Sequence, residues 1–198
     1  MTPDLEIHPL TRERLPDLAG LFGQGGDPKW CWCASFRVRG MTFRNASARE
    51  NRAVLEAAVD QLEGRAPGLI AYRDGEAIGW VSLGPRDDYE RLQHSRVLAQ
   101  VDDRPVWSIV CFVAGRRGRR QGVAVALLDA AVNYARQHGA TLLEAYPVET
   151  DGARIPSANA YMGTLGMFER AGFEVVERRQ WNRSTAVRPI VRRAIRSR

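Results

Sequence analysis

One stretch near the middle of the chain restricts its possible folds more than any other. Residues 106–114 are apolar, residues 115–118 form a Gly-Arg-Arg-Gly turn, and a helical pattern runs from Gly122 to His138. The free N–H groups of a helix's first turn, together with the helix dipole, favour a bound anion. Gly122 and Ala124 are small, so a phosphate can approach the backbone closely. This order of strand, cationic turn and helix start predicts a site for a pyrophosphate group.

Length and composition indicate a single soluble domain. The chain has 198 residues, of which 44% are hydrophobic and 26% charged. No run of about 18 apolar residues is present, so we expect no membrane span. The first residues resemble no signal peptide, which favours a cytoplasmic location. We therefore expect one domain over residues 1–198, with its core at about 5–180 and a basic C-terminal strand within 181–198.

The cysteine pattern favours neither disulfides nor a metal. The chain has three cysteines, and Cys31 and Cys33 are too close in sequence for an easy disulfide. Structural zinc sites usually combine two pairs of ligands at paired spacing, and that pattern is missing. We therefore expect a reducing compartment and no metal.

Basic residues exceed acidic ones, with a net charge of +6. The excess is almost entirely arginine, since Lys29 is the only lysine. It reflects either genome composition or attraction for a polyanion, such as a phosphorylated cofactor or RNA. The segment 178–198 contains eight Arg and no acidic residue, and the alternation at 187–192 predicts a terminal edge strand.

The rest of the chain alternates between strand and helix patterns. Asp74-Gly75 between two apolar runs predicts a hairpin. A long loop over 148–158 holds Glu149, Asp151 and Arg154, and long loops in compact domains are often functional. We expect further strands at 5–10, 68–73, 77–83, 141–147 and 173–178, and helices at 11–22, 48–63 and 162–171.

Two motifs in this order of elements resemble the GCN5-related N-acetyltransferase (GNAT) superfamily. Residues 119–124, Arg-Arg-Gln-Gly-Val-Ala, match its acyl-CoA motif Arg/Gln-x-x-Gly-x-Gly/Ala. Residues 167–173, Met-Phe-Glu-Arg-Ala-Gly-Phe, are similar to the end of the family's late helix. The resemblance covers about residues 5–180. It implies an α/β (α+β layered) fold, in which about four helices flank a mixed, mostly antiparallel sheet of six to seven strands.

The resemblance implies acetyl-CoA as cosubstrate and a direct attack through a tetrahedral intermediate. A backbone N–H near Phe112 or Val113 would stabilise the oxyanion. Many members have a tyrosine that protonates the departing thiolate, but the aligned residue here is Phe168, which cannot donate a proton. The thiolate would then be protonated by another group or by solvent, or the reaction would need no acid. The residues expected at the cofactor are Cys111, Phe112, Val113, Arg119, Arg120, Gln121, Gly122, Val123, Ala124 and Phe168.

Attack by an amine requires its deprotonation, because a free alkyl amine has a pKa of about 10.4. Glu144 lies within an apolar strand pattern, where a carboxylate is costly to bury unless it is paired or used. It is either a base at the active centre or a strand-end carboxylate facing water. We take Glu144, Tyr146 on the same strand face, and Glu149 on the following loop as candidate catalytic residues.

The acceptor site is harder to predict. The segment Trp30-Cys-Trp-Cys33 is either a hydrophobic plug or an aromatic wall that suits a flat acceptor or a cation. The candidate acceptor-binding residues are Trp30, Trp32, Asp88, Tyr89 and Tyr161.

The leading hypothesis is transfer of acetyl from acetyl-CoA to a primary amine of a small molecule. One alternative keeps the fold but takes the acyl group from aminoacyl-tRNA. Another is a non-catalytic module that binds CoA in a regulatory role or binds nucleic acid. A monomer and a homodimer both agree with the sequence.

Overall fold

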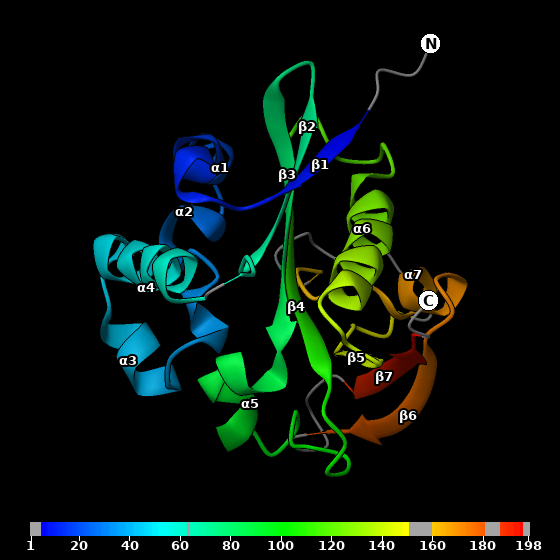
Figure 1. The fold of residues 1–198 in the computed structure, drawn as a ribbon. Coiled ribbons are helices and arrows are strands. Elements are labelled where there is room, and N and C mark those ends of the chain that lie inside the picture. The colour runs from blue at the N-terminus through cyan, green and yellow to red at the C-terminus, as the bar shows by residue number, and fades with distance from the viewer. Residues whose placement is uncertain (1–4, 63, 151–159, 181–186, 196–198) are drawn as a thin grey trace.

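A seven-stranded mixed sheet forms the centre of the protein (Figure 1). The computed structural model describes residues 5–62, 64–150, 160–180 and 187–195. The strand order is β1-β2-β3-β4-β5-β7-β6, and only β4 and β5 are parallel neighbours. The strands are β1 (Glu6–Pro9), β2 (Gly68–Arg73), β3 (Glu76–Pro85), β4 (Trp107–Ala114), β5 (Leu142–Ala145), β6 (Glu174–Arg179) and β7 (Arg188–Ala194).

Helices cover both faces of the sheet (Figure 1). One core cluster packs α6 and α7 against one face, and a second packs α1, α4 and α5 against the other. The structure also contains the short helices α2, α3 and α5, besides the four helices that we expected. The sequence did not predict them because none is long enough to show a helical repeat of apolar residues. The helices are α1 (Leu15–Gly23), α2 (Pro28–Cys31), α3 (Gly40–Asn45), α4 (Ala48–Gln61), α5 (Glu90–His94), α6 (Val123–Gln137) and α7 (Leu165–Arg170).

A bulge in β4 decides which side chains face the two layers. Ser82 pairs with Cys111, and Leu83 pairs with Ile109, so Val110 has no partner on β3. Val110 and Cys111 consequently both belong to the core beneath α1, whereas Ile109 and Phe112 belong to the core beneath α6.

Strands β4 and β5 pair only over a short distance. Their last paired residues are Ile109 and Ala145, after which β4 continues to Ala114. Pro147 follows soon after β5 and has no backbone N–H to extend the ladder. The edge of β4 beyond Ile109 is therefore left without β5 as a neighbour.

The predicted strands and long helices are confirmed, with one correction. The strand expected at the edge near the C-terminus, β7, lies between β5 and β6. Ile190 and Val191 are both fully buried on opposite faces, which suits an inner strand. The Asp74-Gly75 hairpin is confirmed by positive φ angles of 51° and 75°. Asp151 and Arg154 lie outside the described residues.

Gly79 permits α6 to pack closely on β3. A Cβ at Gly79 would lie 2.5 Å from Val123 Cγ1 and 3.0 Å from Leu127 Cδ1. We predict that Gly79→Ala lowers the free energy of unfolding by about 1–3 kcal/mol through overpacking. Gly20→Ala in α1 is the control, because its Cβ would meet nothing within 4 Å; it should be neutral or stabilise by up to about 1 kcal/mol. Chemical denaturation of both variants tests this, and equal effects would contradict it.

Candidate functional site

A cavity of about 480 Å³ lies where α1, α2 and α3 face the part of β4 that extends beyond its pairing with β5. One end reaches the β4–α6 turn and the other reaches α5. Its lining is Leu21, Gln24, Gly25, Gly26, Asp27, Pro28, Trp30, Cys31, Cys33, Ser35, Phe43, Arg91, Cys111, Phe112, Val113, Ala114, Gly115, Arg116, Arg119 and Tyr161.

The β4 wall of the cavity has its backbone donors already occupied. The Phe112 N–H donates to the Tyr161 carbonyl at 2.6 Å. Successive N–H groups of a strand point to opposite sides, so those of Cys111 and Val113 point toward β3. The backbone N–H groups expected to stabilise the oxyanion, near Phe112 and Val113, are therefore already hydrogen-bonded. The Phe112 N–H can bind a ligand only after it releases the Tyr161 carbonyl.

A pair of buried thiols lies beside this wall. Cys33 Sγ and Cys111 Sγ are 3.3 Å apart, and the Trp80 indole N–H donates to Cys33 Sγ at 3.3 Å. The hydrogen bond from Cys111 lowers the pKa of the Cys33 thiol, whereas burial raises the pKa of Cys31 to about 12. Trp32 and Cys33 have positive φ angles of 45° and 53°, which turn the chain after α2.

The turn before α6 has the geometry expected of an anion site. Gly122 precedes the helix with a φ of 74°, and Ala126 N–H makes the first bond, to the Gly122 carbonyl at 3.0 Å. The amides ahead of Ala126 therefore lie outside the helical ladder. A second hollow of about 300 Å³ lies beside this turn, lined by Arg73, Asp74, Ile78, Arg117 and Gln121.

The expected cofactor residues separate into three groups. Cys111, Phe112, Val113 and Arg119 line the cavity, and Gln121 lines the second hollow. Arg120 and Gly122 are exposed at the turn, Ala124 is half-buried, and Val123 is buried in the core. Phe168 is fully buried, with its ring centroid 6.1 Å from that of Phe112 and 5.0 Å from that of Phe173.

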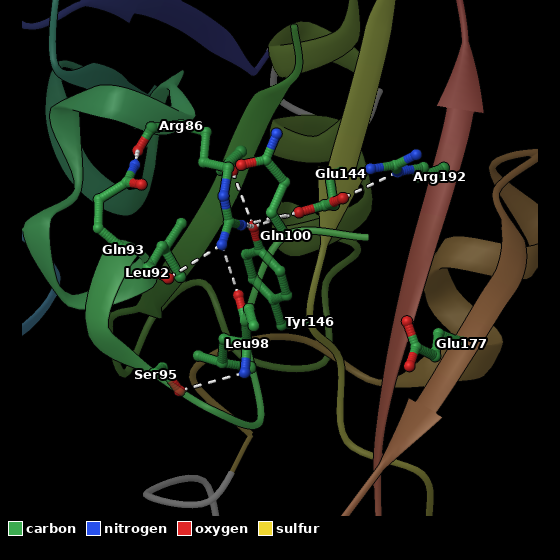
Figure 2. Close-up of polar contacts among 12 residues, drawn as sticks. Arg86, Leu92, Gln93, Ser95, Leu98, Gln100, Glu144, Tyr146, Glu177 and Arg192 are labelled. Atoms are coloured by element: carbon green, nitrogen blue, oxygen red, sulfur yellow. Dashed lines mark hydrogen bonds and ion pairs between the residues drawn. The ribbon is translucent and has the colours of Figure 1, made fainter. Parts of the chain in front are cut away.

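Glu144 lies in a buried network of charges (Figure 2). It is not among the residues that line the cavity. Arg86 Nη1 donates to its Oε1 at 3.0 Å, and Arg192 Nε donates to its Oε2 at 2.8 Å. The Tyr146 hydroxyl donates to Glu144 Oε1 at 2.6 Å. Burial raises the pKa of Tyr146 well above its usual value. Arg192 also reaches Asp102 at 2.7 Å, and Arg104 followed by Arg192 holds the pKa of Asp102 well below its usual range.

This network corrects the alternative that Glu144 faces water, because Glu144 is fully buried. Its two oxygens already accept three hydrogen bonds, so removal of a proton from an amine would require a rearrangement. Glu149, the third candidate, pairs with Arg178 at 3.1 Å. The structure thus places none of the three candidate catalytic residues on the cavity.

The expected acceptor residues are also divided. Trp30 and Tyr161 line the cavity. Trp32 is buried, with its ring centroid 5.2 Å from that of Phe22. Asp88 Oδ1 accepts from Arg65 at 2.9 Å, and burial raises the pKa of Tyr89 to about 12.

Sequence reasoning missed Phe43, Arg91 and Arg116 on the cavity. Phe43 and Arg91 lie on the short helices α3 and α5, within polar segments that carry no periodic signal. Arg116 belongs to the basic turn that the sequence did single out, although the motif begins only at Arg119.

Comparisons with known proteins identify the class. The acetyltransferase (GNAT) family model matches residues 32–173, more than half of the chain, so the chain belongs to this family. The fold and the family together define it as an acetyltransferase, in a family whose cosubstrate is acetyl-CoA. A search of curated protein sequences found no significant match.

Solved structures share the fold over almost the whole chain. The polyamine N-acetyltransferase of Drosophila melanogaster, which forms N-acetylagmatine, is 10% identical, with a TM-score of 0.62 and coverage of 97% of this chain and 100% of that one. A GNAT enzyme from Kribbella flavida is 14% identical, with a TM-score of 0.58 and coverage of 96% and 98%. A GNAT acetyltransferase from Streptococcus pneumoniae is 14% identical, with a TM-score of 0.56 and coverage of 97% and 99%. At these identities the likeness concerns the fold alone.

The described residues contain no group of three or more His, Cys, Asp or Glu side chains placed to hold a metal ion. Within the same part of the chain, no helix is long and apolar enough to cross a membrane.

The buried network leads to a prediction about stability. Glu144→Gln removes the charge between Arg86 and Arg192, and we expect the free energy of unfolding to fall by about 3 kcal/mol. Glu149→Gln breaks the partly exposed pair with Arg178 and should change it by about 0.5 kcal/mol or less. Urea denaturation of both variants measures the difference. A loss for Glu144→Gln as small as that of the control would contradict a structural role.

Proposed function

We propose that the protein transfers an acetyl group from acetyl-CoA to a primary amine of a small molecule. One observation carries the proposal: a cavity extends from the basic turn before α6, along the edge of β4 that β5 does not cover, to an aromatic end. A donor with an anionic head and a long arm would fit the first part. An amine acceptor would meet it at the second.

The donor's pyrophosphate would bind at the start of α6. The backbone N–H groups there make no helical hydrogen bonds, and together with the helix dipole they favour a bound negative charge. Arg116 and Arg119 are exposed and line the adjoining end of the cavity. Arg73 and Gln121 line the neighbouring hollow, which offers space and charge for a further phosphate.

The arm of the donor would run along β4. Phe112 is the position whose N–H points away from β3, and this N–H is held by the Tyr161 carbonyl. A donor carbonyl that took the place of Tyr161 would gain this hydrogen bond. The acyl carbon would then lie near the thiol of Cys111, which lines the same wall.

Proton transfer needs groups other than Glu144. Asp27 is the one carboxylate among the described residues that line the cavity, and it is exposed. The amine's proton would therefore pass to Asp27 or to water. Tyr161 lines the cavity beside β4, whereas Phe168 is buried, so the Tyr161 hydroxyl is the candidate acid for the departing CoA thiolate.

Two glycines at opposite ends of α6 test the donor site. Gly122 and Gly139 have φ angles of +74° and +79°, and a Cβ at either would meet nothing within 4 Å. Valine should strain both positions similarly, but only Gly122→Val obstructs the anion site. Acetyl-CoA at 100 times its Kd should stabilise the wild type and Gly139→Val by about 2.7 kcal/mol. Thermal melts should show no such shift for Gly122→Val, and a full shift would refute the assignment.

A second prediction tests the acid. Tyr161→Phe removes the hydroxyl but keeps the backbone carbonyl that accepts from Phe112. We expect kcat to fall about 100-fold, with little change in KM for acetyl-CoA. Steady-state CoA release measures both constants. An unchanged kcat together with an unchanged pH profile would exclude Tyr161 as the acid.

A further inference from the structure

The acceptor end of the cavity carries a cation that no carboxylate of the described residues neutralises. Arg91, on α5, is half-buried and lines the cavity. Among the described residues it has no ion pair or hydrogen bond, whereas the adjacent Glu90 accepts from Arg39 at 2.8 Å. A half-buried guanidinium without a partner is ready to bind an anion.

Arg91 is held in place before any ligand arrives. Its guanidinium carbon lies 5.0 Å from the centroid of the Phe36 ring. Stacking on a ring fixes the guanidinium plane and leaves its N–H edge available. Helix α5 is anchored as well, because Arg86 Nη2 donates to the Leu92 carbonyl at 3.0 Å (Figure 2).

An apolar surface lines the same cavity. The Trp30 and Phe43 rings have centroids 4.6 Å apart and lie on the segments α2 and α3. Trp30 is 38% exposed, which is unusual for so large an apolar side chain and leaves its ring available for contact.

The charges of the lining disfavour a polycationic acceptor. Among the described residues, the cavity is lined by Arg91, Arg116 and Arg119 and by one carboxylate, that of Asp27. Arg116 and Arg119 lie at the basic turn, where the donor's phosphates would neutralise them. Arg91 lies on α5 instead, and its charge remains for the acceptor.

We propose that the acceptor is an amine that also carries a carboxylate, in the manner of an apolar or aromatic α-amino acid. Arg91 binds the carboxylate through two parallel N–H···O bonds, and Trp30 and Phe43 contact the side chain. The inference rests on the proposed acetyltransferase function and names its substrate class.

Matched pairs of amines test this inference. Phenylalanine is compared with 2-phenylethylamine, leucine with 3-methylbutylamine, and agmatine serves as a cationic acceptor. CoA release by the wild type should give a kcat/KM about 10- to 100-fold higher for each amino acid than for its decarboxylated partner. Arg91→Ala should abolish this preference mainly by raising KM for the amino acid, while Arg91→Lys should keep part of it.

Arg136→Ala is the matched control, because Arg136 is half-buried on α6, as Arg91 is on α5, and among the described residues its side chain bonds only to Asn133, at 2.8 Å. It should leave the preference unchanged. Equal or faster turnover of the decarboxylated amines or of agmatine overturns the inference, as does a preference that survives in Arg91→Ala. A third outcome is that none of these amines supports CoA release. In that case, an acetyl-CoA-dependent rise in melting temperature means that the inference about the acceptor fails. Without such a rise, the proposed function itself fails.

Discussion

The carboxylate of Glu144 between two guanidiniums is the interaction on which the arrangement of the sheet and the cavity depends. Arg86 comes from the segment after β3 and Arg192 from β7, so one carboxylate joins three parts of the chain. Arg86 also donates to the carbonyls of Leu92 and Leu98, at 3.0 and 2.6 Å. The same network thus fixes both the order of the strands around β5 and the position of α5 at the cavity.

Sequence reasoning identified what local pattern encodes. The β4–turn–α6 unit and the Asp74-Gly75 hairpin depend on residues close together in the chain, and both are confirmed. The cost of burying Glu144 was also recognised. Its partners were not, because Arg86 and Arg192 are 58 and 48 residues away and nothing local marks them as a pair.

Other features depend on tertiary packing alone. The alternation around Ile190 and Val191 is the same for an edge strand and an inner one, and only the placement of β6 outside β7 distinguishes them. The segments that carry Phe43 and Arg91 are helices of six and five residues, too short to show a period. The expected acceptor residues Trp30 and Trp32 diverge because positive φ angles at Trp32 and Cys33 turn the second ring into the core.

The hydrogen bond from the Phe112 amide to the Tyr161 carbonyl has a consequence for what sets affinity for the donor. An incoming carbonyl gains this amide only by displacing another carbonyl, so the exchange is close to neutral in free energy. In the proposed binding mode, the affinity would then come mainly from contacts between the donor's phosphates and the exposed arginines of the turn. Such contacts weaken as ions screen them, over a Debye length of about 8 Å at physiological salt. Ionic strength would therefore affect the occupancy of the site by the cosubstrate far more than the contacts of the arm along β4 would.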